Sequence, residues 1–283
     1  MKIIFGVDGS KYARWAAEWI ARMPFTTPCR VTAVHVVDLA SLRAPLVVQP
    51  LGAIEPLVQA ESRRLQAEAK RVVAETKALL SSLGMQGKVI TEKGAIAPTI
   101  LKHVTGRGDL VVVGAQGLDA LDRFMLGSIS TKVTVHAACS VLVVKQPARP
   151  IRRILLATDG STASDKALRF LLQKLQPDGA SGTEKVEVLV MHVLPSFAHT
   201  VRGVMGTRLV HRYAGRLGRA GYRMSELAKS GHVADEIMKT ADREKTDLII
   251  LGARGHGAVA RLFLGSVSTR VVQHSSCSVL VVR

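Results

Sequence analysis

Two glycine-containing loops with the same spacing are the residues of this sequence best suited to bind a phosphate group. Each follows the pattern Gly-x-x-Gly, nine residues, Gly-Ser; the positions are Gly114, Gly117, Gly127 and Ser128 in the first half, and Gly252, Gly255, Gly265 and Ser266 in the second. Glycine has no Cβ, so a ligand can approach its backbone closely. The final Gly-Ser pair opens a predicted helix, whose N-terminal N–H groups attract an anion. The pattern therefore predicts two phosphate cradles, in which a side chain at Gly265 would take the space of the phosphates.

The segments that contain the two loops are copies of each other. Residues 109–144 align without a gap on residues 247–282, with 20 identities in 36 positions. The length of 283 residues leaves room for two domains of ordinary size. The repeat predicts two similar domains, residues 1–146 and 151–283, joined by a linker at residues 147–150.

Apolar runs and helical periodicity alternate along each half. Strands are predicted at 2–7, 31–37, 88–92, 109–113 and 140–145, and then at 153–158, 186–193, 222–227, 247–251 and 278–283. Helices are predicted up to Met23 and at 57–83, 95–104 and 127–137, and then up to Lys174 and at 203–219, 233–240 and 267–274. This alternation predicts an α/β fold of two tandem Rossmann-like domains, each a parallel sheet with helices on both faces. Ligands bind such sheets at the carboxyl ends of the strands, where both glycine loops lie.

Asp8 and Asp159 occupy the same place in the two halves, directly after the first strand. An aspartate there fits a turn or a helix cap, and it also fits a carboxylate that faces a bound nucleotide or its metal ion. Both halves retain Asp-Gly-Ser beside the glycine loop, which favours the second interpretation. His35 and His192, at the ends of the second strands, have no nucleophile and base beside them and are predicted to be satisfied by neighbouring backbone.

The chain has a formal net charge of +17. Its basic residues are spread over both halves with acids between them, which favours a solvated basic surface over a polyanion-binding face. No signal peptide and no apolar run of membrane-spanning length is present, so the chain is expected in the cytoplasm and away from membranes. Cys29, Cys139 and Cys277 are too few for a disulfide framework and are predicted to be small buried hydrophobes.

The glycine loops, the Asp-Gly-Ser turns and the strand-end pairs His35-Val36 and His192-Val193 resemble the universal stress protein family, specifically its ATP-binding class. The resemblance covers essentially the whole chain as two consecutive domains. It implies a five-stranded parallel sheet of order 3-2-1-4-5 in each domain. Family members associate through the last strand, so it also implies that residues 140–145 and 278–283 pair the halves into an internal pseudo-dimer. A homodimer of the whole chain stays open.

In the family, the first-strand aspartate and a valine after the second strand hold adenine and ribose, the valine mainly through its backbone. The glycines and the serine take ribose and phosphates, and the residue after the serine adds a backbone N–H donor. The resemblance thus implies ATP, with or without Mg²⁺, held by Asp8, Val36, Gly114, Gly117, Gly127, Ser128 and Ile129, and by Asp159, Val193, Gly252, Gly255, Gly265, Ser266 and Val267.

The sequence therefore predicts an ATP-binding protein of the stress response, in which bound nucleotide biases conformation or partner binding. No general base, acid pair or metal-ligand cluster is evident beyond Asp8 and Asp159, so a fast enzyme is not expected. Slow ATP hydrolysis or nucleotide transfer stays an alternative, as does binding of a nucleic acid to the basic surface. Asp119 and Asp122 in the first loop, against Arg254 and His256 in the second, predict tighter ATP binding in the second half.

Overall fold

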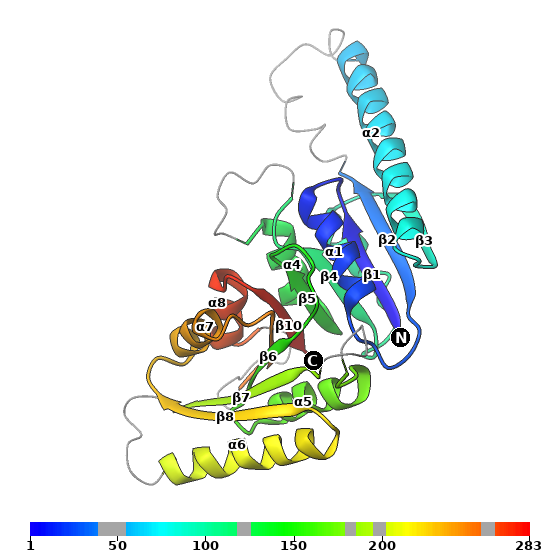
Figure 1. Cartoon of the computed structure of the whole chain (residues 1–283). Helices are drawn as coiled ribbons and strands as arrows, with labels where there is room; N and C mark the ends of the chain where they lie inside the picture. The colour runs from blue at the N-terminus through cyan, green and yellow to red at the C-terminus, as the bar shows by residue number, and fades with distance from the viewer. Residues whose placement is uncertain (39–54, 118–125, 179–184, 195–201, 256–263) are drawn as a thin grey trace.

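A computed structural model describes residues 1–38, 55–117, 126–178, 185–194, 202–255 and 264–283. One twisted ten-stranded sheet runs through the middle of the molecule (Figure 1). Asp119, Asp122 and His256 lie outside the described residues. Of the loop residues with different charges in the two halves, the structure describes Gln116 and Arg254.

The order of elements is the same in the two halves. The first contains β1 (Lys2–Val7), α1 (Lys11–Arg22), β2 (Arg30–Val37), α2 (Glu55–Ser82), β3 (Gly87–Lys93), α3 (Ile96–Leu101), β4 (Leu110–Gly114), α4 (Ser128–His136) and β5 (Ser140–Val144). The second contains β6 (Arg153–Ala157), α5 (Thr162–Lys174), β7 (Glu187–Leu194), α6 (Arg202–Arg219), β8 (Arg223–Ser230), α7 (Val233–Arg243), β9 (Leu248–Gly252), α8 (Ser266–His274) and β10 (Ser278–Val282). The predicted alternation is confirmed, and the predicted helix at 95–104 ends earlier, at Leu101.

The two halves join edge to edge. The sheet order is β3-β2-β1-β4-β5-β10-β9-β6-β7-β8, so each half has the predicted order 3-2-1-4-5 with parallel pairing inside it. β5 and β10 pair antiparallel, with Leu142 opposite Leu280. The predicted pairing of the closing strands is therefore present within the chain. It covers two apolar strands that would otherwise be exposed edges.

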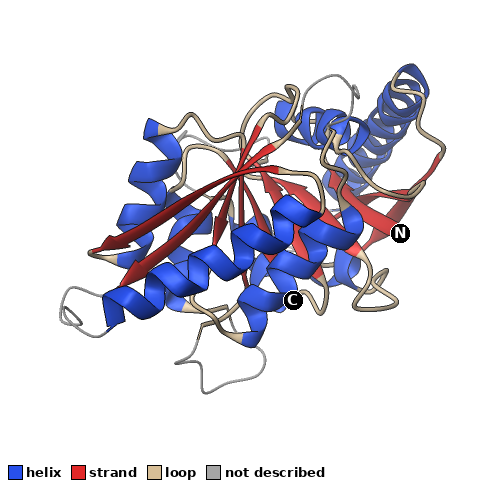
Figure 2. Cartoon of the chain, turned by 60° about the horizontal axis from the view of Figure 1, so that its bottom comes forward, coloured by secondary structure: helices blue, strands red, loops and turns tan. Residues whose placement is uncertain are grey.

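Helices cover both faces of the sheet (Figure 2). Side chains alternate between the faces along each strand, so Ile3 and Phe5 point into one core and Ile4 into the other. The first core is completed by α1, α2, α5 and α6, and the second by α3, α4, α7 and α8. Each core is continuous across the seam between the halves, because Leu142 and Leu280 share the first and Val141 and Val281 share the second.

The last basic residue of each half crosses the seam. Lys145 Nζ donates to the carbonyl of Ser275 at 2.7 Å, directly after α8. Arg283 Nη2 donates to the carbonyls of Thr134 and Val135 in α4, at 2.6 and 2.9 Å. The last carbonyls of a helix have no partner within it, and basic side chains can satisfy them. Each half therefore stabilises the end of the helix that begins at the other half's glycine loop.

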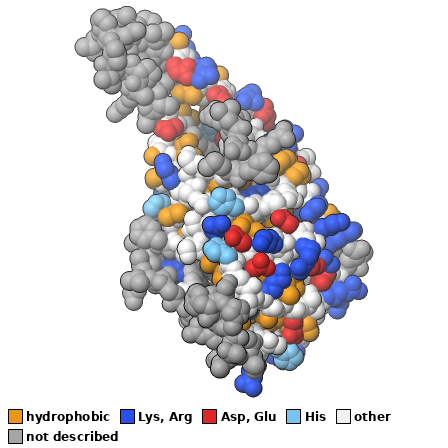
Figure 3. Space-filling model, turned by 90° about the vertical axis from the view of Figure 1, so that its left-hand side faces the viewer, with side chains coloured by type: hydrophobic (Ala, Val, Ile, Leu, Met, Phe, Trp, Pro, Cys, Tyr) orange, Lys and Arg blue, Asp and Glu red, His pale blue; other side chains and the backbone are white. Residues whose placement is uncertain are grey.

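Acidic and basic side chains are intermixed on the surface, as the sequence predicts. Figure 3 shows this on the face at the left of Figure 1. Arg270 pairs with Asp235 at 3.1 Å, and Lys229 pairs with Glu236 at 3.0 Å. Among the helices of the described part of the chain, none combines the length and the apolar character that crossing a membrane requires.

All three cysteines are free; Cys139 and Cys277 are buried beside the central strands, as predicted, whereas Cys29, also predicted to be buried, is only half-buried. Burial is the main cause that raises the pKa of the Cys139 thiol to about 11 and that of Cys277 to about 12. A pKa raised by folding means that the folded state keeps protons that the unfolded chain loses. The stabilisation is complete below pH 9 and is lost as the pH rises through the folded values.

Replacing both buried thiols, in the variant Cys139→Ala/Cys277→Ala, should flatten the alkaline loss of stability. Between pH 8 and pH 10 the free energy of unfolding of the parent should fall by roughly 2–3 kcal/mol more than that of the variant. Urea unfolding at the two pH values measures both falls. Titrating groups that do not interact with the two thiols are common to both proteins and cancel in the comparison, whereas Lys145, whose pKa Cys277 raises, cancels only in part. Equal falls in the two proteins would contradict the assignment.

Candidate functional site

Each half has a cavity at the carboxyl ends of its strands, between the first-strand turn and the glycine loop. The first-half pocket has a volume of about 470 Å³ and the second-half pocket about 770 Å³. All fourteen residues predicted to bind nucleotide line these two cavities, seven in each half. The structure therefore brings together residues that lie up to 121 positions apart in the sequence, from Asp8 to Ile129.

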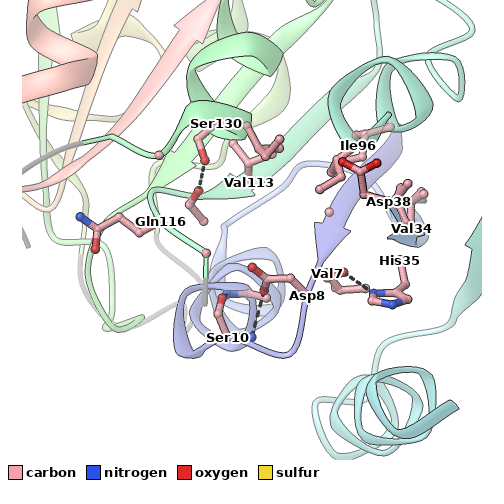
Figure 4. Close-up of a pocket in the computed structure, with 18 of the residues that line it drawn as sticks. Val7, Asp8, Ser10, Val34, His35, Asp38, Ile96, Val113, Gln116 and Ser130 are labelled. Carbon is pink, nitrogen blue, oxygen red and sulfur yellow. Dashed lines mark hydrogen bonds between the residues drawn. The ribbon is translucent and has the colours of Figure 1, made fainter. Parts of the chain in front are cut away.

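The aspartate after the first strand has two tasks, one for each carboxylate oxygen. Oδ1 of Asp8 accepts the backbone N–H of Ser10 at 2.9 Å (Figure 4), and Ser10 in turn caps α1. Oδ1 of Asp159 accepts from the N–H of Ser161 at 2.9 Å in the same way. This holds the side chain in place, with Oδ2 close to the second glycine of the loop at the edge of the cavity. The turn role and the site role are thus compatible.

The glycines of one motif differ in what a Cβ at each position would contact. An ideal Cβ at Gly117 would lie 2.9 Å from Asp8 Oδ2, and one at Gly255 would lie 2.5 Å from Asp159 Oδ2; among the described residues, no backbone beyond the adjacent residues lies within 4 Å of either. A side chain at either position would therefore enter the cavity beside the carboxylate. Gly265 differs, because its Cβ would lie 3.4 Å from Arg254 Cα, at ordinary contact with the loop.

The first glycine of each motif is a packing residue. A Cβ at Gly114 would lie 2.5 Å from Tyr12 Cβ and 2.9 Å from its carbonyl carbon, and one at Gly252 would lie 2.6 Å from the carbonyl carbon of Ala163. These atoms belong to α1 and α5, so glycine lets the strand end approach the helix closely. The ligand contact that the resemblance implies for Gly114 and Gly252 stays a prediction.

Hydrogen bonds close each loop onto the helix that follows it. The N–H of Gly127 donates to the carbonyl of Ala115 at 2.8 Å, and Ser130 Oγ donates to the carbonyl of Gly114 at 2.6 Å (Figure 4). The second half repeats this with Gly265 and Ser268. Gly127 supplies no side-chain cap to α4, so the N–H groups of its first turn are offered at the pocket. The serine two residues after Gly-Ser had no predicted role, although its presence in both halves marks it.

The histidines at the second strands lie as predicted. His35 Nδ1 lies 2.9 Å from the carbonyl oxygen of Val7, and His192 Nδ1 lies 2.7 Å from that of Thr158, which confirms that neighbouring backbone satisfies them. The ladder between β1 and β2 ends at the pair Val7 and His35. Val36 is the next residue, so its backbone passes the end of that ladder at the pocket, which suits the backbone contact the resemblance implies.

The walls of the pockets come from residues that the sequence did not single out. Asp38, Leu65 and Glu68 line the first-half pocket, after β2 and from α2. Leu194, Gly206 and Leu209 line the second-half pocket, from β7 and α6. Within the residues that the structure describes, no group of three or more His, Cys, Asp or Glu is placed to hold a metal ion.

Comparisons with known proteins agree with this architecture. A family model described as the universal stress protein family matches residues 1–145 and 150–283. A universal stress protein of Mycolicibacterium smegmatis is 30% identical over 302 aligned positions, covering 99% of this chain and 96% of its own. One from Thermus aquaticus is 34% identical over 142 positions, 47% of this chain and 98% of its own. The crystal structure of a universal stress protein from Archaeoglobus fulgidus covers 100% of this chain and 98% of its own, at 18% identity and a TM-score of 0.70.

Proposed function

The chain belongs to the universal stress protein family, and we propose that its two pockets bind an adenine nucleotide, ATP, whose occupancy modulates a role in the stress response. One observation carries the proposal. In both halves the aspartate after the first strand lies close to the second glycine of the loop, and both line a cavity that opens at the start of a helix. The proposal places this activity in the cytoplasm and takes the chain to act on a partner through its nucleotide-dependent conformation.

The residues present fit such a ligand. Glycine at 117 and 255 leaves a space that a Cβ would fill, and the first turn of α4 or α8 offers N–H groups to phosphates there. In the first half, Asp8 and the backbone of Val36 would hold adenine and ribose, and Gly127, Ser128 and Ile129 the phosphates. The second half would use Asp159, Val193, Gly265, Ser266 and Val267 in the same way.

Blocking both cavities should abolish ATP binding without unfolding the protein. In the variant Gly117→Val/Gly255→Val, each added side chain meets only the end of an aspartate side chain, so the fold should persist. Titration calorimetry should show at least a tenfold loss of ATP affinity, which corresponds to about 1.4 kcal/mol. Gly106→Val is the matched control, because a Cβ there has no neighbour within 4 Å and Gly106 lies outside both cavities. A folded double variant that binds ATP like the control would contradict the proposal.

Two alternatives have their own readouts. A nucleotide hydrolase would release ADP above background, and Asp159→Ala would abolish the release. A polyanion-binding protein would retain nucleic acid in the Gly117→Val/Gly255→Val variant, with an affinity that falls steeply as salt is raised. Neither is part of the proposal.

A further inference from the structure

We propose that the two pockets select different ligands: the second-half pocket takes the nucleoside triphosphate, and the first-half pocket takes a nucleoside or nucleoside monophosphate of low negative charge. The inference rests on the proposed function, because it takes both cavities as nucleotide sites. The described loop residues are nearly the same in the two halves, so selection between ligands has to come from the surrounding walls.

Three carboxylates line the first-half pocket. Asp8 follows β1, Asp38 follows β2, and Glu68 comes from α2; all three are half-buried. Figure 4 shows Asp8 between the side of the cavity that carries Gln116 and the side that carries Asp38. Among the described residues that line this cavity, none is Lys or Arg. A ligand in this pocket therefore has carboxylates on more than one side.

Two of the three arginines of α2 are engaged with other acids. Arg64 donates to both carboxylate oxygens of Glu61, at 2.6 and 2.8 Å. Arg71 Nη1 donates to Glu75 at 2.9 Å. Both pairs are exposed along the helix and lie outside the residues that line the cavity. Glu68 contributes to the raised pKa of Arg64, so this arginine offsets part of the charge that Glu68 brings to the pocket.

The second-half pocket has a different wall. Leu194 of β7 and Leu209 of α6 line it; Leu194 matches Val37 of the first half, and the counterpart of Asp38 lies outside the described residues. A Cβ at Gly206 would lie 2.8 Å from His192 Cδ2, so α6 lies directly against β7 on this side. Among the described lining residues, α6 therefore brings no carboxylate to the second-half pocket, whereas α2 brings Glu68 to the first.

The charges at the loops differ in the same sense. Arg254 lines the second-half pocket at the position that Gln116 occupies in the first. Asp159 is the single carboxylate among the described residues lining that pocket. A guanidinium attracts phosphates and carboxylates repel them, and partial burial weakens the screening by salt. The ribose hydroxyls and amino groups of an uncharged nucleoside, by contrast, can donate to carboxylates.

Titration of the full chain with one pocket blocked at a time tests the inference. Gly255→Val leaves the first-half pocket open, and Gly117→Val leaves the second. Calorimetry with adenosine, AMP and ATP should give at least tenfold tighter binding of adenosine or AMP than of ATP by Gly255→Val, and the reverse order by Gly117→Val. Adding Asp38→Asn/Glu68→Gln to Gly255→Val should raise its ATP affinity about tenfold and leave adenosine unchanged.

Glu75→Gln is the matched control, since it removes a carboxylate from the same helix outside the pocket; it should leave the ligand order of Gly255→Val unchanged. Equal or tighter binding of ATP than of adenosine by Gly255→Val would overturn the inference while leaving the proposed function intact. An equal gain in ATP affinity from Glu75→Gln would also overturn it. Failure of both single-pocket variants to bind any of the three ligands would instead overturn the proposed function, and this inference with it.

Discussion

Residues 1–146 expressed alone should form dimers or aggregates in place of a stable monomer. The fragment keeps β5 but loses β10, so a strand whose residues Val141 to Val144 are fully buried in the full chain becomes an open apolar edge. It also loses Arg283, which donates to the last turn of α4. Unpaired strand edges recruit another strand, and a second copy of β5 offers nearly the same surface as β10.

Size-exclusion chromatography with light scattering measures the result. Adding residues 147–283 as a separate chain is the control and should convert the fragment to a one-to-one complex, because the seam can then form as it does in the parent. A fragment that stays monomeric and folded at micromolar concentration would show that the antiparallel joint contributes little.

Gly252→Ala should destabilise the protein by about 3 kcal/mol or more, whereas Gly265→Ala should cost under about 1 kcal/mol. The Cβ at Gly252 would lie 2.6 to 2.8 Å from the carbonyl carbon, the carbonyl oxygen and the Cβ of Ala163, and backbone atoms of a packed helix cannot move aside cheaply. At Gly265 the nearest atom is 3.4 Å away, and the backbone angles of φ −68° and ψ 157° suit alanine.

Urea unfolding of both variants measures the difference, and the same substitution in the same motif makes them matched. Gly114→Ala in the first half should behave like Gly252→Ala, since its Cβ would meet Tyr12 at 2.5 Å. Equal stability of Gly252→Ala and Gly265→Ala would show that the first glycine has no packing role.

The fold was predictable because two independent signals agree. The gapless repeat indicates two similar units, and the alternation of apolar strands with amphipathic helices indicates a parallel sheet in each. The seam was implied by the resemblance, because family members associate through the last strand. The closing strands Ser140–Val144 and Ser278–Val282 fit it, since they share the sequence Ser-Val-Leu-Val-Val and are apolar on both faces. A strand that is apolar on both faces at the edge of a sheet calls for a partner.

The site was predictable only in part. Residues close to the motifs, such as Asp8 and Gly117, could be placed because strand ends meet at one edge of a parallel sheet. Glu68 could not, because its position depends on how α2 lies over β2, which the periodicity of α2 does not specify. Asp38 directly follows β2, so the strand-end argument applies to it as well, although it was not singled out. The spacing of the glycine motif also did not predict which glycines pack against a helix and which lie at the cavity. Whether glycine leaves room for a ligand or for a helix depends on the direction of its missing Cβ, which spacing alone does not give.

The antiparallel joint between β5 and β10 has a consequence for how this protein could connect other molecules. Strands on the two sides of the joint run in opposite directions. The carboxyl ends of the strands, and with them the two pockets, therefore lie at opposite ends of the strands in the two halves. Any partner that recognises the rim of one pocket would find a similar rim at the pocket of the other half. A single molecule would then be bivalent, and a multivalent partner would be crosslinked by it, with an avidity set by the rigid sheet between the two rims.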